Sequence, residues 1–250
     1  MPYGLYISAE GAHAQSQRMD VIANNLANVD TVGFKRELAI LRARSTEAVD
    51  QGLSLPGSGT IDDVGGGIAM WQTVTDHATG PPKKTDAKTD VAIPQPGVFF
   101  AVQKGEETLL TRAGNFAITP DRRLTTQQGY NVLDSAGNPI FIRDDPAWHI
   151  DGTGIVQQLG ATQSLALVQP ESLGDLVKAG ENLFRPLAET TDVPLNERQV
   201  KSGYLEMSTV RPTSEMTDLI HASRAMEANI NMMKTQNEML AGLINRILKA

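Results

Sequence analysis

The C-terminal stretch from residue 216 to residue 248 reads MTDLIHASRAMEANINMMKTQNEMLAGLINRIL. Apolar residues recur in it at every seventh position, and a second apolar row lies three residues ahead of the first. The first row is Leu219, Met226, Met233, Leu240 and Ile247, and the second is Met216, Ile230 and Ile244. This spacing predicts a helix with a coiled-coil seam. At about 1.5 Å per residue, the helix would be roughly 50 Å long.

The N-terminal segment carries a matching apolar row. Its members are Leu5, Ala12, Met19 and Leu26, with Ala9, Ile22 and Ala23 beside them. The pattern predicts a helix from Tyr3 to Asn28, which the turn-forming and β-branched residues 29–33 bring to an end. Because each helix is too apolar on one side to be stable alone, we expect both to pack against helical partners.

Between the two helices the apolar period changes. Residues 37–69 mix charged residues with a glycine-rich stretch and are expected to form an extended linker. From residue 70 to residue 210, short β-rich runs alternate with turn clusters, which predicts an antiparallel β domain. The expected fold class is therefore α+β, mainly β, in which the N- and C-terminal helices form a coiled-coil-like arm. The expected segments are 1–36, 37–69, 70–210 and 211–250, and the last is expected to pack with the N-terminal helix.

Composition argues against several classes of function. The formal net charge is -7 and the pI is about 5.1, so a phosphate-binding surface and a nucleic-acid partner are not expected. The sequence has no cysteine, which excludes disulfides and thiolate catalysis. Its histidines do not fall at metal-ligand spacing; they are His13, His77, His149 and His221. We expect no catalytic residue, cofactor or metal.

Two features of the sequence concern membranes and export. The longest apolar runs are far shorter than a bilayer-spanning helix, so no membrane insertion is expected. The first ten residues lack a basic region, an apolar run of signal-peptide length and a cleavage pattern. We therefore expect export, if it occurs, to use a dedicated machine without a cleavable signal peptide.

Three motifs in sequence order resemble one known family. Residues 23–36 read ANNLANVDTVGFKR, residues 111–116 read TRAGNF, and residues 203–210 read GYLEMSTV. Together they resemble the flagellar basal-body rod and hook proteins at the N-terminal signature, the β-domain motif and the C-terminal signature.

The resemblance implies a structural axial subunit of the bacterial flagellar rod, located in the basal body in the periplasmic space. It implies that terminal helices pack with those of neighbours into an inner tube, with the β domain outside. The implied partners are other rod subunits and the flagellar export apparatus. It implies no catalysis.

The expected assembly interface combines the two apolar rows with the asparagines of the N-terminal motif. Its residues are Leu5, Ala12, Met19, Ile22, Asn24, Asn25, Leu26, Asn28, Leu219, Met226, Ile230, Met233, Leu240, Ile244 and Ile247. From spacing alone, Asn24, Asn25 and Asn28 would simply satisfy backbone groups at the helix end. With the resemblance we expect both roles: ending the helix and bonding across the packed arms.

Two other classes of protein compete with the rod subunit as explanations of the sequence. A coiled-coil adaptor with a β binding domain would also explain the apolar rows, but it predicts charged flanking positions that the N-terminal helix largely lacks. An enzyme would need a convergent polar constellation, and the sequence offers none.

Overall fold

The computed structural model describes residues 3–53, 55, 65–143 and 148–247. The chain divides into two compact units, which are described separately. The helical unit comprises residues 1–27, 37–76 and 211–250, and the β unit comprises residues 28–36 and 77–210. The chain therefore passes from one unit to the other several times. These boundaries differ from the expected ones, because residues 28–36 join the β unit and residues 70–76 join the helical unit.

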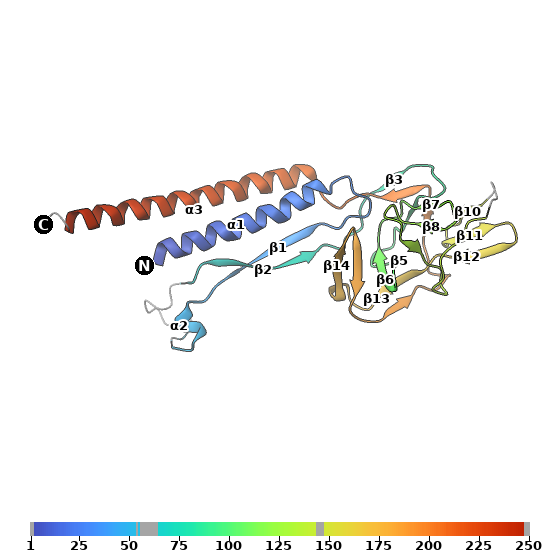
Figure 1. The fold of residues 1–250 in the computed structure, drawn as a ribbon, viewed down its shortest axis with the longest axis horizontal. Coiled ribbons are helices and arrows are strands. Elements are labelled where there is room, and N and C mark those ends of the chain that lie inside the picture. The colour runs from blue at the N-terminus through green and yellow to red at the C-terminus, as the bar shows by residue number, and fades with distance from the viewer. Residues whose placement is uncertain (1–2, 54, 56–64, 144–147, 248–250) are drawn as a thin grey trace. The chain divides into compact units, whose positions relative to one another are not determined.

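The helical unit is built on two long helices, α1 (Tyr3–Ala27) and α3 (Pro212–Ile247). They pack along each other in opposite directions (Figure 1). Pro212 is the first residue of α3, a position where the missing N–H of proline costs no helical hydrogen bond. The predicted pairing of the terminal helices is confirmed.

A two-stranded ribbon completes the helical unit. Strand β1 (Glu37–Ala43) pairs antiparallel with β2 (Ile68–Thr75), and α1 contacts both strands, so it lies between the ribbon and α3 (Figure 1). The ladder runs from Glu37 opposite Thr75 to Ala43 opposite Ile68, with an irregularity between Ile40 and Leu41. A short helix α2 (Glu47–Asp50) follows β1.

The structure differs here from the expected linker. Residues 37–43 form a strand, because they pair with β2, which follows the glycine-rich stretch in the sequence. Much of that stretch, residues 54 and 56–64, lies outside the described residues.

Among its described residues, the β unit contains a large sheet and three smaller ones. The strands of the large sheet are β5 (Phe99–Lys104), β6 (Glu107–Thr111), β7 (Ala117–Ile118), β8 (Leu124–Thr125), β9 (Asn131–Val132), β13 (Leu167–Pro170), β14 (Leu176–Gly180), β15 (Leu183–Pro186) and β16 (Thr190–Asp192). The main path runs β14-β15-β6-β5-β9-β8-β7, and β13 pairs with both β5 and β16. A 3-10 turn, η2 (Leu173–Asp175), precedes β14.

The smaller sheets bring together segments from both ends of the unit. Their strands are β3 (Pro82–Lys84), β4 (Val91–Ala92), β10 (His149–Ile150), β11 (Ile155–Gln158), β12 (Ala161–Ser164), β17 (Lys201–Ser202) and β18 (Tyr204–Glu206). Strand β18 pairs with β3, β17 pairs with β4, and β10, β11 and β12 form a meander. Every strand pairing within the described ranges is antiparallel, which confirms the predicted architecture of the central region.

Apolar side chains from alternating strand positions fill the β unit. The rings of Phe100 and Phe116 meet edge to face, with their centres 5.1 Å apart, and Phe99 packs against Phe184 in a second cluster. Both clusters are buried, so the unit has the apolar core that an independent domain requires.

A buried group of charges lies beside this core. The Lys35 ammonium donates to Glu206 Oε1 and to the Ala78 carbonyl, both at 2.6 Å. The other carboxylate oxygen of Glu206 accepts from Arg112 Nη1 at 3.2 Å. All three side chains are almost completely buried. Burial lowers the pKa of the Arg112 guanidinium, and the Glu206 carboxylate opposes that change.

These charges tie the segment that follows α1 into the β unit. The Gly33 N–H donates to the Glu206 carbonyl at 2.7 Å. Asn182 Nδ2 donates to the Val32 carbonyl at 2.7 Å, and Lys178 Nζ donates to the Lys35 carbonyl at 3.0 Å. Gly33 has a φ of +68°, and a Cβ there would lie 2.5 Å from the Arg112 backbone carbon. Residue 33 must therefore be glycine.

We predict that replacing Glu206 with Ala destabilises the β unit by about 3–5 kcal/mol, because two buried cations lose their carboxylate. Chemical denaturation followed by fluorescence would measure this, since Trp148 is buried in the β unit whereas Trp71 is largely exposed. Glu107→Ala, which removes an exposed carboxylate paired with Arg185, is the control and should leave the transition in place. The prediction would be contradicted if Glu206→Ala and Glu107→Ala unfolded at the same denaturant concentration.

Candidate assembly surface

The apolar rows predicted from the sequence contribute in part to the α1·α3 pair. On α1, Ala12 and Ile22 are buried, whereas Leu5, Met19 and Leu26 are half-buried. On α3 the half-buried members are Leu219, Met226, Ile230, Met233 and Leu240. Ile244 and Ile247 remain exposed, at 55% and 72%. The chain thus uses most of these apolar residues internally and leaves the last member of each α3 row uncovered.

The asparagines of the N-terminal motif have three different environments. Asn25 is 1% exposed, and its carboxamide donates to the Glu37 carbonyl at 2.8 Å and accepts from the Glu37 N–H at 2.9 Å. Its Nδ2 also lies 3.4 Å from Glu215 Oε2 of α3. Asn28 Oδ1 accepts locally from the Thr31 hydroxyl at 3.1 Å. Asn24 is exposed on α1.

Several residues of the helix pair were not among the predicted interface residues because they are small or polar. Glu215 and Ala222 have no exposed surface, and Asn229 and Gln236 are half-buried on the same side of α3. Gly4 and Gly11 of α1 lie against the carboxamides of Gln236 and Asn229. The signal was present in the sequence, since Glu215, Ala222, Asn229 and Gln236 also recur at seven-residue spacing.

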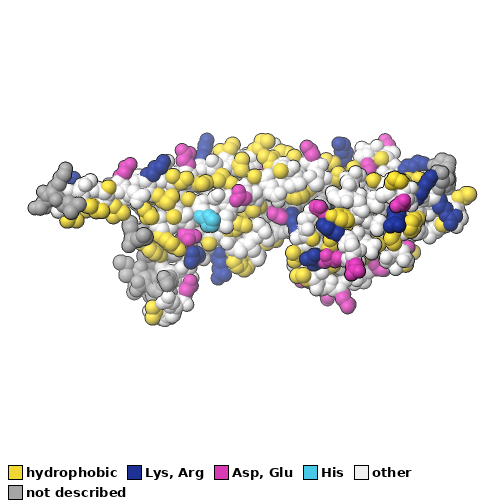
Figure 2. Space-filling model, in the orientation of Figure 1, with side chains coloured by type: hydrophobic (Ala, Val, Ile, Leu, Met, Phe, Trp, Pro, Cys, Tyr) yellow, Lys and Arg dark blue, Asp and Glu magenta, His cyan; other side chains and the backbone are white. Residues whose placement is uncertain are grey.

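A long apolar face of α3 is open to solvent. Its more-than-half-exposed side chains are Met216, Ile220, Met232, Met239, Leu243, Ile244 and Ile247. In Figure 2, apolar side chains gather along the helices of this unit. All residues from Ala241 to Ile247 are exposed. Several large apolar side chains exposed on one helix are typical of a protein–protein interface.

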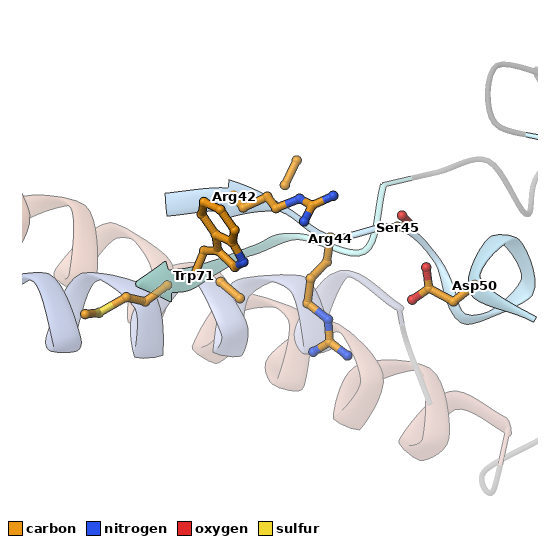
Figure 3. A pocket seen from close by; sticks show the side chains of 8 residues that line it. Arg42, Arg44, Ser45, Asp50 and Trp71 are labelled. Atoms are coloured by element: carbon orange, nitrogen blue, oxygen red, sulfur yellow. The ribbon is translucent and has the colours of Figure 1, made fainter. Parts of the chain in front are cut away.

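The ribbon carries a shallow pocket of about 280 Å³ beside Trp71 (Figure 3). Its polar lining residues are Arg42, Arg44, Ser45 and Asp50. The Arg42 guanidinium lies 5.9 Å from the centre of the Trp71 ring, and Arg44 Nη1 is 3.4 Å from Glu10 Oε1.

The described part of the chain holds no candidate membrane span or metal cluster. None of its helices combines the length and apolarity needed to cross a bilayer. No group of three or more His, Asp or Glu side chains in the described ranges could hold a metal ion. The arrangement offers surfaces for association.

Family comparisons match three segments of the chain. Residues 5–35 match the family "Flagella basal body rod protein", which covers α1 and the segment after it. Residues 95–158 match "Flagellar hook protein FlgE/F/G D1 domain", and residues 201–246 match "Flagellar basal body rod FlgEFG protein C-terminal".

Full-length relatives show the same similarity. The chain is 34% identical to the flagellar basal-body rod protein FlgF of Caulobacter vibrioides, over 100% of this chain and 99% of that protein. It is 33% identical to FlgG of Bacillus subtilis, over 96% and 97%. FlgG of Borreliella burgdorferi is 31% identical, over 99% of each.

We predict that Asn25→Ala destabilises the helical unit by about 1–3 kcal/mol, because the partly buried Glu37 backbone groups lose their side-chain partner. Thermal unfolding followed by helical circular dichroism would measure the loss. Asn24→Ala is the matched control, since the neighbouring asparagine is exposed, and its effect should stay within about 0.5 kcal/mol. Equal effects at the two positions would show that the bonds of Asn25 do not stabilise the unit.

Proposed function

The chain belongs to the flagellar basal-body rod protein family, and on that premise we propose that it joins its neighbours through the exposed apolar face of α3. Members of this family are structural and non-enzymatic, and the chain is a subunit of the flagellar basal-body rod. Family membership also implies assembly with other rod subunits. The helix surface used for that assembly and the identity of the neighbours are the proposed parts.

The observation that supports the proposal is the uncovered apolar surface at the end of α3. Ile247 continues the row of Met233 and Leu240, and Ile244 continues the row of Ile230, but both lie among residues 241–247, which are all exposed. Fully burying an Ile, Leu or Met side chain contributes about 1.5–3 kcal/mol. Packing this end against a neighbouring helix would therefore stabilise an assembly without rearranging the α1·α3 pair.

Within the family, we propose that the chain occupies the place of a FlgF-type subunit. The match to the Caulobacter FlgF protein covers both chains almost completely, and it supports this assignment. FlgG proteins are nearly as similar, so a distal-rod subunit is the alternative. Rod position would be tested by crosslinking the subunit to its neighbours in isolated basal bodies.

We also propose that the chain reaches the rod through the flagellar export apparatus. The absence of cysteine supports this route, because a chain that travels unfolded cannot then form disulfides on the way. Secretion of the full chain by a strain with an intact export apparatus, and its retention by a strain lacking the export ATPase, would test the proposal.

We predict that Ile244→Asp blocks incorporation into the rod while the isolated chain keeps its fold. The side chain is already more than half exposed, so a charge there costs the monomer little. In a packed interface the same carboxylate would cost several kcal/mol. Incorporation would be measured in basal bodies from a strain that lacks its own copy.

Asn237→Asp is the control, because it introduces the same charge at an exposed polar position of α3. Both variants should show the helical content and melting temperature of the natural chain, and only Ile244→Asp should be missing from basal bodies. Normal incorporation of Ile244→Asp would refute assembly through this face. Met233 and Leu240 are less suitable test positions, since they are half-buried within the chain itself.

A further inference from the structure

A row of small and polar residues runs through the middle of the α1·α3 pair. On α1 the contacting residues are Gly4, Gly11 and Asn25, and on α3 they are Gln236, Asn229 and Glu215. The intervals are seven and fourteen residues on each helix, in opposite directions. The three contacts therefore belong to one antiparallel register.

The two glycines make room for the carboxamides. A Cβ on Gly4 would lie 2.7 Å from Gln236 Nε2, and a Cβ on Gly11 would lie 3.1 Å from both Asn229 Nδ2 and Oδ1. Both side chains therefore lie close against the backbone of α1. A larger residue at either glycine would push the opposing carboxamide aside in this register.

The far end of the row is fixed by a hydrogen bond. Asn25 Nδ2 and Glu215 Oε2 are 3.4 Å apart in a buried setting, and both residues are almost without exposed surface. Between the glycines and this bond, Arg18 Nη2 and Asp218 Oδ1 are 3.9 Å apart. Polar contacts thus occur along most of the length of α1.

The apolar row of α3 cannot select a register by itself. Met226, Met233 and Leu240 are similar in size and spaced by seven residues, and methionine adapts to different neighbours. If α3 slid by seven residues, an apolar residue would again face each apolar position. The polar row opposes that shift, because Asn229 would face the larger Arg18 in place of Gly11 and Glu215 would lose its hydrogen bond to Asn25.

The polar row also has a cost in stability. Gln236 Oε1 is buried and has no hydrogen-bond partner among the described residues. An apolar residue of the same size would avoid that desolvation penalty. Polar residues at single seam positions of coiled coils have this effect: they specify register at the expense of stability.

We propose that the contacts Gly4·Gln236, Gly11·Asn229 and Asn25·Glu215 form a register key that sets how far α3 extends beyond the start of α1. In the keyed register, residues 241–247 remain uncovered. If α3 slid by seven residues, the length of its uncovered apolar end would change by about 10 Å. This inference rests on the proposed function: if the end of α3 is the assembly surface, the six key residues position that surface.

The test measures the register of the purified full-length chain. Since the natural sequence has no cysteine, His13→Cys and Glu238→Cys would carry the only spin labels. Both positions are exposed and lie outside the key. Double electron–electron resonance, with unlabelled chain in excess, would report the distance within one molecule. With the natural key residues, the distance between the two labels should have a single narrow distribution.

Removing the key should release the register. Asn229→Ala with Gln236→Ala should add a population displaced by up to about 10 Å while helicity is retained, because alanine favours helix. Asn231→Ala with Asn237→Ala is the matched control, since it removes two carboxamides from exposed positions of the same helix. The control should keep the single distance.

A second pair of variants tests the same contact from α1. Gly11→Leu should displace the distance, and Gly11→Leu with Asn229→Ala should restore it, because the smaller side chain makes room for leucine. An unchanged single distance without the two carboxamides would overturn the proposal. Loss of helicity in that variant would also overturn it, by showing that these residues hold the helices together and do not select their register. Neither result depends on rod assembly, so the key can fail while the Ile244→Asp prediction holds.

Discussion

The Glu206 carboxylate is the point at which distant parts of the β unit meet. It accepts from Lys35, from Arg112 and from the Gly80 N–H at 2.8 Å. A carboxylate can be buried this deeply only when cations and N–H groups replace the water around it. The segment that follows α1 and the segment that precedes α3 are also hydrogen-bonded to each other, since Thr209 N–H donates to the Phe34 carbonyl at 3.1 Å. The family signature at residues 31–36 is thus largely occupied by contacts within its own chain.

Stability and register are divided between different residues in the helical unit. The apolar rows supply burial, which is non-directional and changes little when equivalent residues exchange places. Small and polar side chains supply geometry, because the glycines admit a carboxamide at defined positions and the Asn25–Glu215 hydrogen bond forms in one register. The pairing therefore does not follow from the apolar rows alone, although those rows dominate the sequence.

Sequence reasoning recovered the features that repeat locally. Both helices, the antiparallel centre and the family follow from spacing and motifs, and the structure and comparisons confirm them. Strand β1 was not predicted, because its partner β2 follows only after the glycine-rich stretch and charged residues mask its apolar pattern. The Lys35–Glu206–Arg112 group was not predicted either, since its members are separated by up to 171 residues and charged side chains usually indicate exposure. Gly4 and Gly11 were missed because a glycine shows its role only when the atom that it admits is known.

The uncovered face of α3 differs in kind from the covered one. Its exposed methionines, Met216, Met232 and Met239, are flexible and adapt to the shape of a neighbour. Such side chains suit contacts with partners that are related but not identical. The contacts inside the chain rely instead on Gly11, Asn25 and Glu215, each of which accepts one geometry. In the assembly proposed above, the contacts within the subunit would fix the register of α3 and so the length of its exposed end. The contacts between subunits would tolerate neighbours of different sequence. An assembly of related but non-identical subunits would need that division, because each subunit would fold in one way and still pack against neighbours of different sequence.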